Sequence, residues 1–305
     1  MVLPISETIQ DAKEAVTFLE KVLPVIKGSK EPMVLLLSGK AAAYLRLRDA
    51  KGLTQRQTVR DLLEEAKKHL DELAGVTHSH GIYYRVSSTY LREIGDFAGY
   101  YKEALRYLGC IDQDALTIAE KQHYAVCLSV AALLGEDVYN FGELLAHPVL
   151  DVLKGAENAF LVDLLFAFNA GDLTKFEALR PKWTSIHDLA TSHVLLERKI
   201  RLLCLMEMAY IRPANERQLS FKEIAATAKV PINELEHLVM RALSLGLVKG
   251  HIDQVEEKVL LTWVQPRVLS KDQIRAMSER IQQWCRDVGS MHQLTEQAAG
   301  EILTH

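Results

Sequence analysis

Apolar residues recur every three or four positions through the first two thirds of the chain, which is the spacing of one face of an α-helix. Between residues 54 and 75 they form one such stripe: Val59, Leu62, Leu63, Ala66, Leu70 and Leu73. Thr54 with Gln57 three residues later predicts a capping box at the start of this helix, and Gly75 predicts its end. The stripe is long enough for a helix of about five turns that buries one side.

Two further stripes lie on either side of a glycine. The first carries Ile82, Tyr83, Val86, Tyr90 and Ile94. The second begins at Asp96, directly after Gly95, ends before Gly109, and carries Tyr100, Tyr101, Ala104, Leu105 and Leu108. Since neither helix could bury its apolar face alone, we expect the two to pack as a hairpin.

Turn glycines recur between helical stripes at intervals near 40 residues. Four of them, separated by 43, 40 and 36 positions, are Gly52, Gly95, Gly135 and Gly171. Residues 90–98 and 168–176, around two of these glycines, resemble the core of a tetratricopeptide repeat. The pattern predicts a mainly α fold, a right-handed α-solenoid of helical hairpins; the alternative is a set of unrelated hairpins.

The pattern changes after residue 211. Ser220 predicts the start of a short helix, and Pro231 opens a second helix that ends at Gly246. Two β-type runs follow, at residues 247–252 and 259–264. A helix, a turn, a second helix and a two-stranded hairpin, in that order, indicate a winged helix.

The last segment, from Ser270 to about Leu303, predicts one long helix. Its apolar positions alternate in steps of three and four, with Thr295 filling one slot: Ile274, Met277, Ile281, Trp284, Val288, Met291, Ala298 and Ile302. A repeat of 3.5 residues is typical of a helix that packs along another helix. We therefore expect three parts: a solenoid at 1–190, a winged-helix region at 191–268 and a terminal bundle helix at 269–305.

Composition narrows the class of protein. The chain has 305 residues, of which 49% are apolar and 25% charged, as in ordinary globular proteins. Its net charge of −4 argues against a general binder of nucleic acids or membrane surfaces. The longest apolar run, residues 125–135, is too short to cross a bilayer, and Glu7, Asp11 and Glu14 do not fit a signal peptide.

The four cysteines form no metal-binding or redox motif, because no two are close in sequence. Each lies in an apolar helical context, which predicts small buried residues in the reducing interior of the cell: Cys110, Cys127, Cys204 and Cys285.

One histidine motif needs weighing as a metal site. His78-Ser79-His80, followed by Ser88, matches part of the zinc site of JAMM-type isopeptidases, but Leu91 occupies the place of the zinc-binding aspartate. Two histidines are too few to hold a catalytic zinc. No phosphate-binding glycine loop or nucleophile elbow occurs. We therefore predict no catalytic residue, no metal, no cofactor and no enzyme activity.

Nucleic-acid binding is a second class to test, because many winged helices bind DNA. Residues 220–265 contain five Lys and Arg against six Asp and Glu, a net charge of −1. Phosphate would repel such a surface. We therefore expect this module to bind protein rather than nucleic acid.

Several segments resemble a known family. A helical solenoid that runs into a winged helix and a terminal helix is the layout of PCI-domain proteins, which build the proteasome lid, the signalosome and translation initiation factor three. The segments that resemble the proteasome-lid members are residues 100–106, 140–150, 198–208, 212–215, 242–250 and 262–269. Lid subunits of this kind usually carry further N-terminal helices, so the resemblance implies that this chain begins inside the solenoid. Either its start is truncated or this version is short, and contacts made by such helices are not expected of it.

The resemblance implies a non-catalytic scaffold in the lid of the 26S proteasome regulatory particle, in the cytoplasm and nucleus. Its partners would be other PCI-domain lid subunits, the deubiquitinating subunits and the ubiquitin-receptor side of the particle, with no nucleic acid and no membrane. The alternatives are a scaffold of another PCI complex and a nucleic-acid-binding winged helix.

The predicted protein interface has two parts. A free strand edge in the hairpin can pair with a neighbouring strand, and carries Val248, Ile252, Leu260 and Leu261. The terminal helix offers a bundle contact through Ile274, Met277, Ile281, Trp284, Val288 and Met291. The alternative for this helix is that it folds back on its own solenoid.

Overall fold

The computed structural model describes residues 9, 11–26, 29–47, 54–73, 75–112, 116–155, 157–213, 216–266 and 271–303. The chain divides into two compact units, residues 1–264 and 265–305. Among the described residues, no helix combines the length and apolarity that a membrane span requires.

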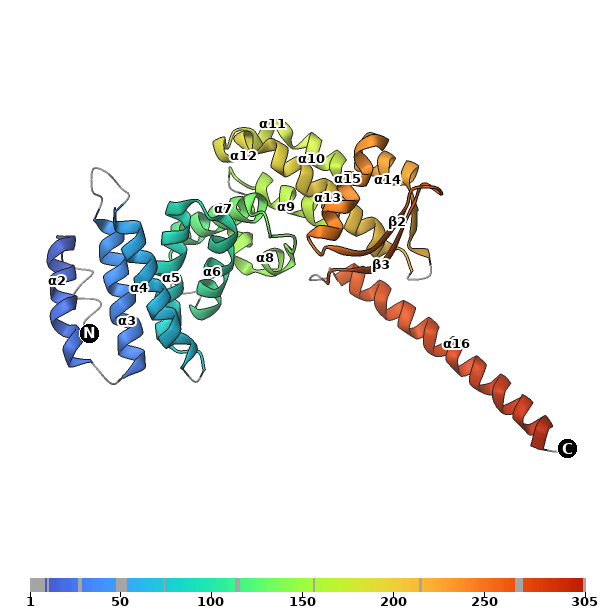
Figure 1. The fold of residues 1–305 in the computed structure, drawn as a ribbon, viewed down its shortest axis with the longest axis horizontal. Coiled ribbons are helices and arrows are strands. Elements are labelled where there is room, and N and C mark those ends of the chain that lie inside the picture. The colour runs from blue at the N-terminus through green and yellow to red at the C-terminus, as the bar shows by residue number, and fades with distance from the viewer. Residues whose placement is uncertain are drawn as a thin grey trace. The chain divides into compact units, whose positions relative to one another are not determined.

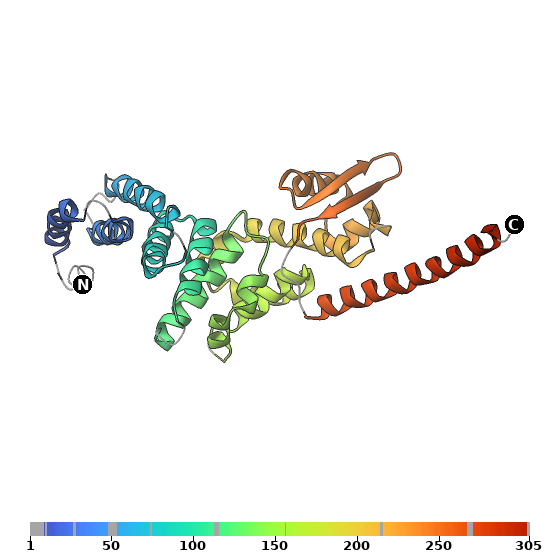
Figure 2. The ribbon, with the colours of Figure 1, turned by 90° about the horizontal axis from the view of Figure 1, so that it is seen from below.

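The first unit opens with helices packed against their neighbours in the chain (Figures 1 and 2). They are α2 (Ala12–Val22), α3 (Lys30–Arg46), α4 (Thr54–Asp71), α5 (His78–Ile94), α6 (Phe97–Cys110) and α7 (Ile118–Leu134), with a 3-10 turn at Leu23–Val25. The stripe of α4 faces a core shared with α3 and α5, in which Val59, Leu63 and Ala66 are buried. The predicted helix therefore buries the predicted face.

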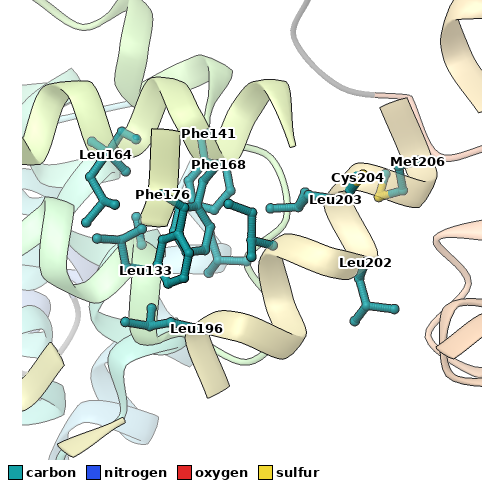
Figure 3. Close-up of a cluster of buried hydrophobic side chains, with 14 of the residues drawn as sticks. Leu133, Phe141, Leu164, Phe168, Phe176, Leu196, Leu202, Leu203, Cys204 and Met206 are labelled. Atoms are coloured by element: carbon teal, nitrogen blue, oxygen red, sulfur yellow. The ribbon is translucent and has the colours of Figure 1, made fainter. Parts of the chain in front are cut away.

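Several short helices and one long helix follow. They are α8 (Gly142–Ala146), a 3-10 helix at Pro148–Leu153, α9 (Phe160–Ala170), α10 (Leu173–Ala178), α11 (Arg180–Trp183), α12 (His187–Thr191) and the long α13 (His193–Ile211). Among them, α9, α12 and α13 contact α7. Figure 3 shows part of the core between them, where Phe168 lies beside Phe141 and Phe176. The ring of Trp183 stacks on Phe176 at 5.3 Å. This core joins α7, α9 and α13.

Two of the glycine turns have the same construction. Gly95 and Gly171 end α5 and α9 in the left-handed conformation, at φ +87° and +63°. The next residue, Asp96 or Asp172, caps the following helix by accepting backbone N–H bonds. Gly135 ends α7 with a negative φ and has a different geometry, and Gly52 lies outside the described residues.

The winged helix closes the first unit. It consists of β1 (Gln218–Ser220), α14 (Phe221–Ala228), α15 (Ile232–Ser244), β2 (Val248–Asp253) and β3 (Lys258–Val264). The strands form an antiparallel sheet in the order β1-β3-β2, so β3 is central. The sequence reasoning predicted two strands and missed β1, because a three-residue strand leaves no readable alternation.

Several local predictions are confirmed and others are wrong. Ser220 caps α14, as expected. The helix expected to end before Gly109 continues to Cys110, and Ile94, assigned to a buried stripe, is 45% exposed. The side chain of Thr54, and with it the predicted capping box, lies outside the described residues.

The expectation of four buried cysteines is wrong for most of them. Cys204 is buried, Cys110 and Cys127 are half-buried, and Cys285 is exposed. The reason is that an apolar sequence neighbourhood does not say which face of a helix meets the core.

The second unit is the helix α16 (Lys271–Leu303). The long terminal helix is therefore confirmed, while Ser270 lies outside the described residues. The mainly α fold that ends in a winged helix is likewise confirmed. The right-handed tetratricopeptide-like arrangement of the hairpins and the three-part division of the chain stay predictions.

Candidate protein-interaction surfaces

The apolar stripe of α16 is exposed along the helix. Trp284 is 68% exposed, and the other predicted positions are also exposed: Ile274, Met277, Ile281, Val288 and Met291. Leu294 is exposed as well. The sequence reasoning missed Leu294 because it gave the neighbouring slot to Thr295, whose hydroxyl instead donates to the Met291 carbonyl within the helix.

The other faces of α16 carry polar pairs within the helix. The Gln283 Nε2 donates to the Asp287 Oδ1 at 2.9 Å, and the His292 Nε2 lies 3.4 Å from the Glu296 Oε1. Both pairs have the i,i+4 spacing that supports a solvated helix surface. The helix is therefore amphipathic, and its apolar side repeats in the manner of a helix packed along a partner.

The structure separates the four hairpin residues of the predicted interface. Val248 and Leu261 are each 1% exposed and belong to the core of the first unit. Ile252 and Leu260 are half-buried. Val248 and Leu261 therefore hold the winged helix together, and Ile252 packs partly buried against the same core. A partner contact at Ile252 and Leu260 stays a prediction.

The free edge of the sheet is well defined. Strand β2 pairs with β3 on one side only, because β3 lies between β1 and β2. The pairing is irregular between Lys249 and Gly250, where a Cβ on Gly250 would collide with the carbonyl oxygen of Leu260. The ammonium of Lys249 lies 4.9 Å from the ring centre of the half-buried Trp263. This edge combines open backbone groups with an amphipathic side-chain pair.

The outer surface of α15 adds an apolar feature that the sequence reasoning missed. Ile232 and Met240 are 53% and 49% exposed and lie two turns apart, on one face with Glu236. The signal was present, because these residues fall outside the stripe of Leu235 and Val239 that faces the core. The same helix carries Glu234 and Arg241 rather than a basic row.

The histidine motif has a structural role at the start of α5. His80 is the third residue of the helix, and its Nδ1 accepts a hydrogen bond from the Thr77 N–H at 3.1 Å, which completes a capping box. The Ser88 hydroxyl donates to the Arg85 carbonyl, and Leu91 packs on the core. In the described part of the chain, no three His, Cys, Asp or Glu side chains gather as metal ligands.

Lys199 is a buried charged residue that the sequence reasoning also missed. It is 3% exposed, and its Nζ donates to the carbonyl oxygens of Ala132 at 2.6 Å, Leu133 at 3.1 Å and Gly135 at 2.7 Å. Burial lowers its pKa from 10.5 to about 7, while the charge of Asp137 opposes that shift. Its position, three residues after Leu196 and four before Leu203, marked it as part of a buried face.

Comparison with known proteins places these features in one family. Residues 1–165 match the family model of PSD13 N-terminal repeats, and residues 180–263 match the PCI domain. The winged helix lies within the PCI match, apart from the last residue of β3.

Individual relatives agree with the family models. The chain is 43% identical to the probable 26S proteasome regulatory subunit rpn9 of Schizosaccharomyces pombe, over 78% of this chain and 62% of the relative. It is 37% identical to the 26S proteasome non-ATPase regulatory subunit 13 of Dictyostelium discoideum, over 94% of this chain and 75% of the relative. The chain therefore spans less than two thirds of the first relative and three quarters of the second.

A more distant relative belongs to another assembly. The translation initiation factor 3 subunit M of Coccidioides immitis is 26% identical over 65% of this chain and 42% of the relative. Identity and coverage are both higher for the proteasome subunits, and the repeat model alone matches more than half of the chain. The chain belongs to the family of the 26S proteasome non-ATPase regulatory subunit 13.

Proposed function

We propose that this chain is a non-catalytic scaffold subunit of the lid of the 26S proteasome regulatory particle, and that it supports lid assembly and ubiquitin-dependent protein degradation. The observation that carries the proposal is the match of both parts of the chain, repeats and PCI domain, to relatives named as proteasome regulatory subunits. The protein would act in the cytoplasm and nucleus.

The surfaces described above support a scaffold role. The open edge of β2 can accept a strand from a neighbouring PCI subunit, because a sheet edge presents unpaired backbone groups. The stripe of α16 can join a helical bundle through its exposed aromatic and aliphatic side chains. We assign these two contacts to other PCI-domain lid subunits, and contacts of the repeats to the deubiquitinating subunits and the ubiquitin-receptor side.

Each of the three predicted parts of the chain would have its own role in the scaffold. Residues 1–190 would space the contacts as a helical array, residues 191–268 would pair through the sheet, and residues 269–305 would join the bundle. No catalytic step is assigned to the chain, because His80 serves as a helix cap and Leu91 is an alkyl residue packed on the core.

Copurification tests the proposal. The full chain is expressed with an affinity tag in its own cells and isolated at moderate salt, and the copurifying proteins are identified by mass spectrometry. We expect the lid subunits in near-equal amounts, together with other subunits of the regulatory particle. Recovery without any proteasome subunit would contradict the proposal.

The similarity to subunit M of translation initiation factor 3 supports a second candidate function, that of a scaffold subunit of this factor. In that case the same purification would recover initiation-factor subunits and ribosomal proteins. Sedimentation of the extract distinguishes the two candidate functions. A lid subunit would sediment with the 26S peptidase activity, and an initiation-factor subunit would sediment with the small ribosomal subunit.

A further inference from the structure

Lys199 joins two parts of the chain that match different family models. The lysine belongs to α13, within the PCI match, whereas its three carbonyl acceptors lie at the end of α7 and just after it, within the repeat match. The bonds span 64 to 67 residues of sequence. Lys199 therefore adds a polar contact between α7 and α13, which also share one hydrophobic core.

The Lys199 ammonium and the carbonyl oxygens at the end of α7 are chemically complementary. The last carbonyls of a helix have no partner within the helix, and their partial negative charge favours a cation. An ammonium has three N–H donors, and three carbonyls receive them here. The rings of Phe141 and Tyr139 lie 5.3 and 5.6 Å from the nitrogen and add favourable cation–π contacts.

The receiving side is held tightly in place. A Cβ on Gly135 would lie 2.9 Å from the Ala131 carbonyl oxygen and 3.2 Å from the Cα of Ala98 in α6. The end of α7 is therefore pressed against α6 on one side while Lys199 holds it from the other.

We propose that Lys199 is a latch that fixes α13 of the PCI region against the end of α7 in the repeats, so that the first unit transmits orientation as one body. The latch adds directional hydrogen bonds to the hydrophobic core that α7 and α13 already share, and a scaffold that positions neighbours needs such rigidity. The latch is independent of which assembly the chain joins. The proposal concerns how rigidly α13 is held against α7, and it involves no contact with a partner.

Lys199→Met tests the latch, because methionine fills the space but removes the shared donor of the three carbonyls, of which, among the described residues, only that of Gly135 keeps a backbone donor, the Val138 N–H at 3.3 Å. Lys229→Met is the matched control: the Lys229 ammonium also bridges two elements, 2.6 Å from Glu177, but both side chains are exposed. Amide hydrogen exchange is followed at residues 132–141 in the full chain. We expect exchange there to rise about tenfold or more in Lys199→Met and to stay unchanged in Lys229→Met.

A distance measurement checks the same joint directly. Spin labels at Lys102→Cys in α6 and Asn233→Cys in α15, both exposed sites, are introduced after replacement of the native cysteines by alanine. We expect a narrow distance distribution with Lys199 and a broader one with Lys199→Met. A folded Lys199→Met protein with unchanged exchange and unchanged width would overturn the latch.

The unmodified protein provides a test that does not depend on the folding of a variant. The latch requires residues 132–141 and residues 196–203 to exchange as one cooperative unit under native conditions. Much faster exchange of the first segment than of the second would also overturn the proposal.

Discussion

At the scale of single residues, the two left-handed turn glycines show how one sequence signal can carry two different constraints. A Cβ on Gly95 would meet no atom within 4 Å, whereas a Cβ on Gly171 would lie 2.6 Å from the Cα of Cys204. Both positions need the left-handed backbone, but only Gly171 also lets two helices approach closely.

Alanine substitutions at these glycines should therefore differ in cost. We expect Gly95→Ala to lower the free energy of unfolding by about 1–2 kcal/mol, from backbone strain alone. Gly171→Ala should add about 1–3 kcal/mol for overpacking against α13. Denaturant titration of both variants measures the difference. Equal losses would show that the contact between Gly171 and Cys204 is not restrictive.

Lys199 predicts a pH dependence of stability. Its pKa is about 7 in the folded chain against 10.5 for an unperturbed lysine, so between these values the unfolded chain binds more protons at this site. The free energy of unfolding therefore rises with pH in this window, by up to about 1.4 kcal/mol per pH unit. Lys199→Met removes this contribution. Denaturant titrations at pH 6.5 to 9 measure both proteins, and parallel pH profiles would contradict the prediction.

At the scale of elements, α16 and the sheet differ in whether their apolar side chains pack on the rest of the chain. Helix α16 belongs to a unit of its own, and its stripe is exposed. An apolar stripe of this length on a solvated helix favours the predicted interaction site, which stays a prediction. The sheet, in contrast, keeps Val248 and Leu261 inside the first unit.

Variants in the stripe should affect assembly more than folding. We expect Ile281→Asp and Trp284→Ala to yield folded proteins that incorporate poorly into the lid, because truncation of a packed aromatic costs roughly 3–5 kcal/mol at an interface as in a core. Gln282→Ala, on a different face, is the matched control. Circular dichroism and copurification give the two readouts. Normal incorporation, or unfolding of the isolated subunit, would assign α16 to the subunit's own core.

A proline in the central strand β3 should disturb folding first and assembly only as a consequence. The Leu261 N–H donates to the Arg217 carbonyl at 2.9 Å, and proline would remove this bond and the buried side chain. We expect Leu261→Pro to unfold the winged helix and thereby to weaken lid association. Leu261→Val keeps the donor and should stay folded. Protease sensitivity of residues 216–264 distinguishes the two variants, and a resistant Leu261→Pro protein would refute the pairing.

At the scale of the whole molecule, the residues that resemble a zinc-dependent isopeptidase serve the fold. His80 completes a helix cap and Ser88 bonds to its own helix. We expect the purified chain to bind no stoichiometric zinc and to leave ubiquitin chains uncut. Metal analysis and a ubiquitin-chain assay, with a zinc isopeptidase as positive control, check this. Zinc at one atom per chain together with cleavage would contradict it.

The sequence by itself determined the apolar stripes of helices such as α4 and α16, the two helices and the hairpin of the winged helix, and the family. Helix stripes such as that of α4 follow from local spacing, caps such as Ser220 need only neighbouring residues, and the αL turns at Gly95 and Gly171 each use a glycine at one position. The long helix α16 followed for the same reason, since its pattern lies within one continuous segment.

Only the tertiary structure decided which side chains are accessible and what the buried polar groups do. Val248 and Leu261 turned inward because their face of the sheet packs on the core of the first unit, which contains residues from α13, α14 and α15. Lys199 met carbonyls 64 to 67 residues distant, and Gly171 met the backbone of α13. Such contacts join segments far apart in the chain, and no local pattern of residues encodes them.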